Sequence, residues 1–251
     1  MFSMTKIVKT NSFELAIYAT GNEQSHKLAL VLPGRLDTKD YANMQSHVDY
    51  LASKGYYAVS FDPPGTWESP GDIGLYSTTN YLKAINELIE YYGNKPTLVI
   101  GHSRGGSMAL LAGTTNQHVT HMVAVMSHHG PTTVGIPDTK GVATKSLRDL
   151  PPGTSRTTDK KEFMLPYAYF EDQTQYDALE ALKTCDKPKL FFYGTEDVLV
   201  TSESVKAMYE TAAEPKMLHE LESEHDYRLH AAVIDEVNKV VADFLARFDN
   251  A

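Results

Sequence analysis

A serine between two glycines is the part of this sequence with the clearest chemical potential. The residues Gly101-His102-Ser103-Arg104-Gly105 follow the apolar run Thr97–Ile100 and precede a stretch of helical character. The pattern Gly-x-Ser-x-Gly arises by chance in chains of this length, so its place between a buried strand and a helix makes it informative. In that setting we expect a tight strand-to-helix turn with Ser103 at its apex.

Such a turn would give the serine the position of a nucleophile. Glycines at 101 and 105 remove side chains that would collide with neighbouring segments. The turn lifts the Ser103 hydroxyl above the carboxyl ends of the strands, where open α/β sheets place their ligands. The backbone N–H of Arg104 then points to where negative charge develops on an attacked carbonyl. The alternative is an inert serine at a glycine-bordered helix start.

The elements around this turn alternate between strand and helix. Continuous apolar runs indicate strands buried on both faces, and longer stretches with helical periodicity indicate helices. The predicted strands are 6–9, 13–19, 28–32, 57–61, 97–100, 122–126, 189–193 and 216–221. The predicted helices are 41–53, 79–92, 105–113, 176–184, 203–213 and 229–248. We therefore expect an α/β fold in one domain, 1–251, with a mostly parallel eight-stranded sheet, helices on both faces and an antiparallel first pair of strands.

The alternation is interrupted between residues 131 and 170. This segment holds five prolines and a basic and polar run from Lys140 to Lys161, without clear periodicity. Connections of this length are uncommon unless they are functional or disordered. We expect a short lid or cap insertion; the alternative is a disordered surface loop. Aromatic residues at its downstream end, Tyr167 among them, would pack over an apolar cleft.

The composition is that of a globular chain with an acidic surface. The net charge of −9 disfavours nucleic acid and anionic membrane faces as partners. No stretch approaches the roughly 20 apolar residues of a membrane span, and Met1–Thr10 lacks the apolar segment of a secretion signal. Cys185 is the sole cysteine, so no intrachain disulfide forms. We expect a cytoplasmic protein; its oligomeric state is left open.

The motif at Gly101–Gly106, the strand 28–32 upstream and the order of elements downstream resemble the α/β-hydrolase superfamily. The resemblance covers nearly the whole chain, weakly in residues 1–25 and not usefully in 131–170. Members of this superfamily are mostly esterases, lipases, peptidases and related acyl-transfer enzymes. The resemblance implies a member of the serine esterase or lipase type, with the nucleophile elbow at Ser103.

A serine hydroxyl needs a base to take its proton, and the base needs a partner that holds its tautomer. The resemblance implies an acid just after the next-to-last strand, where Asp197 matches the family's position and Glu196 lies one step away. The same resemblance places the base after the last strand, where His225 lies on the following loop. The chain order Ser103, Asp197, His225 is the order that this fold uses.

The oxyanion hole needs a second N–H donor from the loop after strand 28–32. The family often has His-Gly there, whereas this sequence reads Pro33-Gly34-Arg35. Because Gly34 is kept, the resemblance implies the backbone N–H groups of Arg35 and Arg104 as the two donors. Their guanidinium groups would lie at the mouth of the site. There they either bind a substrate carboxylate or phosphate, or form ion pairs with acids such as Asp37.

Three further residues are candidates for contact with substrate, besides Tyr167 from the insertion. The segment Asp62–Ser69 resembles a loop seen in many family members, and its Trp67 either lines the pocket or is buried against the sheet. His128 and His129 end the strand 122–126 on the site's side of the sheet. We expect no metal or organic cofactor.

These residues together predict a serine hydrolase, specifically a carboxylesterase, that cleaves an ester of a small or medium-sized acyl substrate through an acyl-enzyme. The same triad on an amide, peptide or carbon–carbon bond, or in acyl transfer, is an open alternative. A ligand-binding protein that keeps the residues without turnover is another. The sequence has no phosphate-binding glycine loop of either common type, which argues against nucleotide binding.

Overall fold

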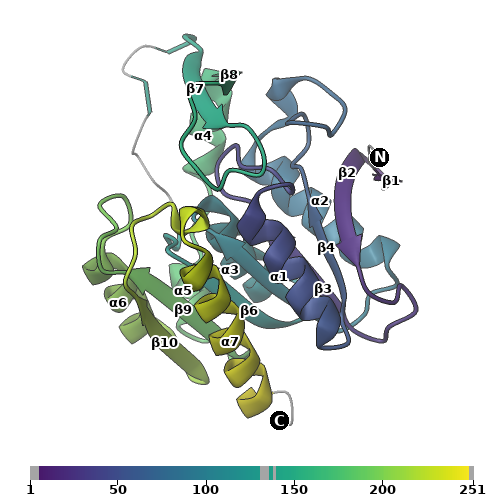
Figure 1. Cartoon of the computed structure of the whole chain (residues 1–251), viewed down its shortest axis with the longest axis vertical. Coiled ribbons are helices and arrows are strands. Elements are labelled where there is room, and N and C mark those ends of the chain that lie inside the picture. Colours follow the sequence, from purple (N-terminus) through teal and green to yellow (C-terminus); the bar gives the residue numbers. More distant parts are fainter. Residues whose placement is uncertain (1–5, 131–135, 138–139, 249–251) are drawn as a thin grey trace.

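The computed structural model describes residues 6–130, 136–137 and 140–248 and shows a central sheet covered by helices (Figure 1). Eight strands within the described residues form this sheet, in the order β1-β2-β4-β3-β5-β6-β9-β10. Their bounds are β1 Lys6–Lys9, β2 Glu14–Thr20, β3 Leu28–Leu32, β4 Tyr57–Phe61, β5 Thr97–His102, β6 Val119–Val125, β9 Lys189–Gly194 and β10 Lys216–Leu221. The β1–β2 and β2–β4 pairs are antiparallel and the others are parallel. The predicted mostly parallel sheet with an antiparallel first pair is confirmed.

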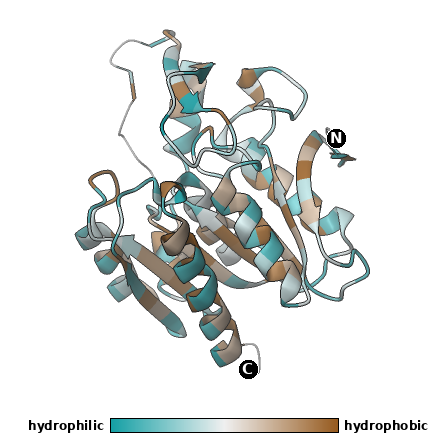
Figure 2. Ribbon diagram, viewed as in Figure 1, coloured by the Kyte–Doolittle hydropathy of each residue, from teal (hydrophilic) through white to brown (hydrophobic). Residues whose placement is uncertain are grey.

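The helices divide between the two faces of the sheet. α1 (Ala42–Ser53) and α7 (Ala231–Phe248) pack on one face, and α2 (Thr78–Tyr91), α3 (Arg104–Thr115) and α6 (Ser202–Thr211) pack on the other. In β3 the side chains of Leu28, Leu30 and Leu32 pack on the face covered by α2, α3 and α6. The side chains of Ala29 and Val31 pack on the face covered by α1 and α7. Burial on both faces explains the unbroken apolar run of this strand. Figure 2 shows the hydrophobic strands lying between the helices.

A second, smaller sheet follows β6. It consists of β7 (Thr144–Asp149) and β8 (Lys160–Leu165), which pair antiparallel, and leads into α4 (Tyr167–Gln173) and α5 (Leu179–Leu182). Two short 3-10 helices, η1 (Ile73–Leu75) and η2 (Tyr227–Leu229), complete the elements of the described residues. In Figure 1 this sheet lies with α4 at the top of the molecule, apart from the central sheet.

This insertion is where the sequence prediction of the elements was wrong. The helix expected at 176–184 is reduced to the single turn α5, and the helix α4 and the hairpin were not expected. The hairpin strands read TKSLRD and KKEFML, with mostly polar side chains that alternate between exposed and partly buried positions. Such strands lack the apolar, β-branched signal on which prediction rests. Residues 131–135 and 138–139 of the expected lid lie outside the described residues.

None of the helices in the described part of the chain has both the length and the apolar character of a membrane span.

Candidate active site

Ser103 lies at the turn between β5 and α3 in a backbone conformation that few residues adopt. Its φ of 53° and ψ of −121° lie in the positive-φ half of the map, which costs a non-glycine residue about 1–3 kcal/mol. A methyl group added at Gly105 would lie 2.0 Å from the Leu32 carbonyl oxygen, and one at Gly101 would lie 2.2 Å from the backbone of Gly105. The structure therefore confirms the steric reason for a glycine on each side of this turn.

Three side chains from three loops form a continuous hydrogen-bonded chain here. Ser103 Oγ lies 2.9 Å from His225 Nε2, and His225 Nδ1 lies 2.7 Å from Asp197 Oδ2. These residues follow β5, β10 and β9, so the carboxyl ends of three parallel strands bring them together. The Asp197 carboxylate can only accept, so Nδ1 carries the imidazole hydrogen and Nε2 is free to accept from the serine.

The Asp197 carboxylate is held by several donors. Its side chain is fully buried, and Oδ1 accepts hydrogen bonds from the N–H groups of Leu199 and Val200 at 2.8 and 2.9 Å. Burial alone would raise the pKa of Asp197, but the hydrogen bond and charge of His225, together with these two N–H groups, hold the pKa below its usual value. Glu196, the rival acid on this loop, is exposed to solvent. Asp197 is therefore the acid that contacts the histidine.

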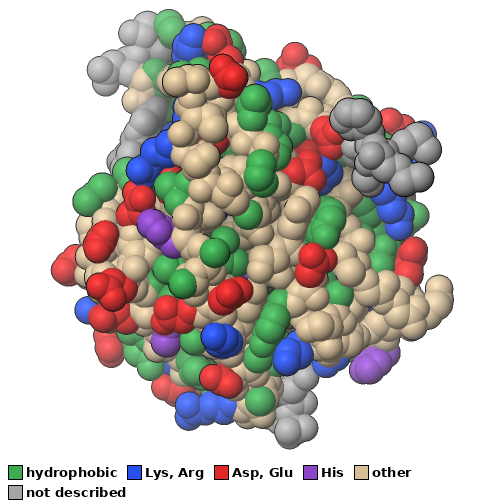
Figure 3. Space-filling view, in the orientation of Figure 1, with side chains coloured by type: hydrophobic (Ala, Val, Ile, Leu, Met, Phe, Trp, Pro, Cys, Tyr) green, Lys and Arg blue, Asp and Glu red, His purple; other side chains and the backbone are tan. Residues whose placement is uncertain are grey.

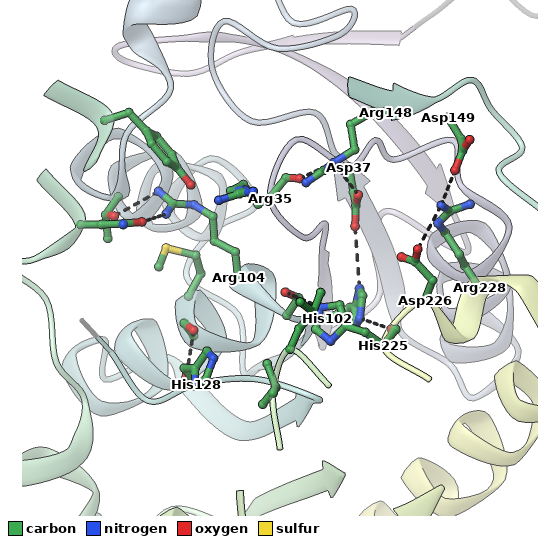
Figure 4. Close-up of a pocket in the computed structure, with 18 of the residues that line it drawn as sticks. Arg35, Asp37, His102, Arg104, His128, Arg148, Asp149, His225, Asp226 and Arg228 are labelled. Atoms are coloured by element: carbon green, nitrogen blue, oxygen red, sulfur yellow. Dashed lines mark hydrogen bonds and ion pairs between the residues drawn. The ribbon is translucent and has the colours of Figure 1, made fainter. Parts of the chain in front are cut away.

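A further set of contacts, centred on Asp37, supports this hydrogen-bonded chain. Asp37 Oδ2 lies 3.7 Å from His102 Nδ1, and Asp37 Oδ1 lies 3.5 Å from Arg148 Nε (Figure 4). Burial would raise the pKa of Asp37, but the nearby His102 ring and the charge of Arg148 hold it below its usual value. His102 in turn contacts the backbone of His225. The carboxylate therefore ties the elbow to β7 of the insertion.

The loop after β3 is fixed at almost every residue. Its Pro33 carbonyl accepts from the Tyr81 hydroxyl at 3.0 Å, and its Arg35 carbonyl accepts from Arg148 Nε at 2.7 Å. The Leu36 N–H donates to the Tyr76 hydroxyl at 3.0 Å. Within the described residues, the backbone N–H groups of Arg35 and Arg104 have no hydrogen-bond acceptor in the protein. Both amides are therefore free to donate to a ligand.

The Ser103 hydroxyl faces a cavity of about 430 Å³. Its walls come from the loop after β3, the pocket-facing side of α3, the hairpin β7–β8, α4 and the loop that carries His225 (Figure 4). The residues of α3 at this wall are Arg104, Ser107, Met108 and Leu111, which share one helix face. The cavity is wide enough for a small or medium-sized organic molecule.

Comparison with known proteins identifies the fold. A model of the alpha/beta hydrolase fold matches residues 30–147. The structure with ferulic acid bound to Est1E from Butyrivibrio proteoclasticus is 17% identical, has a TM-score of 0.78 and covers 98% of this chain and 100% of its own. Alpha/beta hydrolase domain-containing protein 10 from mouse is 16% identical, with a TM-score of 0.77 over 98% of this chain and 99% of its own. The chain has the alpha/beta hydrolase fold.

A further structural neighbour is the thioesterase domain from the curacin biosynthetic pathway. It is 15% identical, with a TM-score of 0.68 over 95% of this chain and 98% of its own. Identities this low establish the shared fold alone. No curated protein matches the chain in sequence.

The pocket contains some of the expected substrate contacts and not others. His128 lines it, and burial lowers the pKa of this imidazole. Trp67 lies outside because its indole N–H donates to the Leu36 carbonyl at 2.8 Å. His129 lies outside because it pairs with Asp177 at 2.8 Å. Tyr167 begins α4, whose pocket side is formed by other residues.

Sequence reasoning missed most of the charged residues that line this pocket. Arg148, Asp149 and Lys160 come from the hairpin, and Arg156 comes from the loop that joins its strands. Arg228 comes from η2, just beyond the histidine loop. A cluster of basic residues in 140–161 was visible in the sequence, but nothing there indicated that a hairpin would fold it over the serine.

Proposed function

We propose that this chain is a serine hydrolase that cleaves a carboxylic ester of a small or medium-sized acyl substrate. The observation that supports it most directly is the hydrogen-bonded chain Ser103–His225–Asp197, with contacts of 2.9 and 2.7 Å, at the wall of the cavity. Ester cleavage by such a chain needs no group beyond the protein and water. A cytoplasmic location is part of this proposal, in keeping with the lone Cys185.

In the proposed mechanism, His225 removes the proton of Ser103 as the serine oxygen attacks the acyl carbon. The positive charge that forms on the imidazole is stabilised by the buried Asp197 carboxylate. The backbone N–H groups of Arg35 and Arg104 donate to the oxyanion of the tetrahedral intermediate. His225 then protonates the leaving alcohol, which breaks the ester bond and leaves the acyl-enzyme.

Deacylation runs through the same residues. His225 removes a proton from water, the resulting hydroxide attacks the acyl carbon, and Ser103 leaves with the proton returned by the imidazole. The products are the free acid and the unchanged enzyme. The ferulic acid in the Est1E structure is a carboxylic acid, the class of product that hydrolysis of an acyl compound such as an ester releases, which supports acyl cleavage here.

The test is covalent labelling with a fluorophosphonate, which reacts with activated serines. We expect stoichiometric labelling of the folded wild type, none in Ser103→Ala and much slower labelling in His225→Ala. Ser53→Ala, which removes an exposed serine at the end of α1, serves as the matched control and keeps the wild-type rate. Absence of labelling in folded wild type would contradict the proposal and favour a ligand-binding protein.

A further inference from the structure

The pocket is cationic in a protein that is acidic overall. Six of its lining residues are arginine or lysine and three are aspartate, whereas the whole chain has a net charge of −9. Figure 3 shows acidic side chains spread along the left and lower parts of the face where α6, β10 and α7 lie. Cations gathered inside a cavity of an acidic protein call for an explanation in terms of what the cavity binds.

Four of these cations are neutralised by acids of the protein. Arg148 pairs with Asp37 at 3.5 Å, and Arg228 pairs with Asp149 at 2.6 Å. Lys160 also contacts Asp149. The remaining member of this set, Arg156, pairs with Glu224. These four residues fasten the hairpin to the rest of the site and leave little net charge for a ligand.

Arg104 differs because its side-chain partners are uncharged. Its Nη2 donates to Thr78 Oγ1 at 3.0 Å and its Nη1 to Gln173 Oε1 at 3.5 Å. The guanidinium carbon lies 4.7 Å from the Tyr169 ring centre and 5.2 Å from that of Tyr76. The Nε is buried with no hydrogen-bond partner, and no carboxylate lies within ion-pair distance in the described part of the chain.

The carboxylate that acts on Arg104 from farther away is already engaged. Asp172 accepts hydrogen bonds from the N–H groups of Thr78 and Thr79 at 2.6 and 3.1 Å, at the start of α2. The two tyrosine rings hold the guanidinium at the wall by cation–π contact without cancelling its charge. Because arginine stays protonated even when its guanidinium is buried, the charge persists at any working pH.

Arg35 supplies a second cation nearby. Its backbone carbonyl is fixed by Arg148, but its half-buried guanidinium has no partner among the described residues. Burial raises the pKa of the Tyr76 hydroxyl, and the charges of Arg104 and Arg35 both act against that rise, so both cations lie near this hydroxyl. Figure 4 shows the two arginines on the same side of the pocket, away from the Asp149–Arg228 pair.

The wall beyond Arg104 is apolar. Met108 and Leu111 lie one and two turns farther along the same face of α3 and line the same cavity. A guanidinium next to a strip of apolar surface matches an organic chain that ends in a planar carboxylate better than it matches a densely charged phosphoryl group. The strip would hold the chain while the two arginines hold its charged end.

We propose that the substrate is an ester that also carries a free carboxylate, bound by the guanidinium groups of Arg104 and Arg35. This inference rests on the proposed function, in which Ser103 attacks the ester carbon of the same molecule. Half-esters of aliphatic dicarboxylic acids are the simplest compounds of this class. A hydrogen-bonded ion pair in a partly buried site favours the charged substrate by about tenfold to a hundredfold over a neutral one of the same shape.

The kinetic test compares monomethyl esters of dicarboxylic acids, from succinic to suberic, with the matching esters in which a carboxamide replaces the free carboxylate. We expect kcat/KM of the wild type to favour the carboxylate by about tenfold or more at the best chain length. In Arg104→Gln and Arg35→Gln this ratio falls toward one. Arg156→Gln, which removes a pocket arginine already paired with Glu224, is the matched control and keeps the ratio.

A binding test separates this inference from the proposed function. In Ser103→Ala, which cannot acylate, calorimetry should show tighter binding of the best half-ester than of its carboxamide, and Arg104→Gln in the same background should abolish the difference. Hydrolysis of both substrates at equal rates, or equal affinity of Ser103→Ala for both, overturns the carboxylate site while leaving the serine hydrolase intact. Selective binding without fluorophosphonate labelling of the wild type supports the carboxylate site and contradicts the hydrolase.

Discussion

His102 donates a hydrogen bond from Nε2 to the backbone carbonyl oxygen of His225 at 2.9 Å, and the two ring centres lie 4.8 Å apart. The residue before the proposed nucleophile thus holds the loop that carries the proposed base. The ring of Tyr227 lies 5.1 Å from that of His102 and limits its movement. The distance from Ser103 to His225 is therefore set by contacts of a residue that need not touch substrate.

Replacing His102 with alanine tests this positioning role. Because the His225 loop loses its support, we expect kcat to fall by about tenfold to a hundredfold with little change in KM. Steady-state kinetics on a p-nitrophenyl ester measures both values. His26→Ala, which removes an exposed histidine remote in sequence from His102, serves as the control. A kcat within twofold of wild type would show that the loop holds its place without this bond.

Replacing Gly105 with alanine tests the steric account of the elbow. The added methyl would lie 2.0 Å from the Leu32 carbonyl oxygen, a contact that only backbone movement can relieve. We expect a loss of about 3 kcal/mol in the free energy of unfolding, measured by urea titration. Gly55→Ala is the control, since its methyl meets open space and only the φ of 88° is strained. An equal loss in both variants would contradict the steric account.

Replacing Asp197 with asparagine tests the tautomer argument. An asparagine can present its NH₂ to His225 Nδ1 and so favour the wrong tautomer, and we expect kcat to fall by about a thousandfold or more while the fold is kept. Glu196→Gln is the control, because this neighbouring acid is exposed. Activity of Asp197→Asn near the wild-type level would remove Asp197 from the mechanism.

Replacing Asp149 with asparagine tests how the hairpin is held. Burial would raise the pKa of Asp149, but Lys160 and Arg228 hold it well below its usual value. A lowered pKa means that this stabilisation is complete above the unfolded-state pKa, about 4, and is lost as pH falls toward the folded-state value. We expect Asp149→Asn to lose about 3 kcal/mol at neutral pH, with the deficit shrinking below about pH 4.

The control for Asp149 lies on the same hairpin. Glu162 forms an exposed ion pair with Lys145, so Glu162→Gln should change the free energy of unfolding by less than about 1 kcal/mol. Urea titrations of the two variants and the wild type across this pH range give the comparison. A deficit of Asp149→Asn that is constant with pH would show that its charge does not hold the hairpin.

The parts of the site that the sequence predicts are those that depend on the central sheet. Ser103, Asp197 and His225 each follow a parallel strand, so predicting the strands also places the three side chains at one edge. Trp67 shows the limit of this reasoning. Its side-chain rotamer decides whether the indole lines the pocket or donates its N–H to the Leu36 carbonyl. No periodicity in the sequence carries that information.

The hairpin β7–β8 could not be predicted for a different physical reason. Its strands contact distant residues through ion pairs, such as Asp149 with Arg228 and Arg148 with Asp37, and only β8 contributes an apolar pair, Phe163 and Leu165, to the core. Long-range ion pairs leave no local pattern. The charge of the pocket, on which the choice between the two roles left open for Arg104 depends, is therefore not visible in the sequence.

Whether Ser103 is an activated nucleophile is measured most directly by the site of fluorophosphonate modification, found by peptide mass mapping of the labelled wild type. We predict one adduct per chain, on the peptide that contains Ser103, formed at a rate that depends on His225. An adduct on any other residue, or an unmodified folded protein, would contradict it.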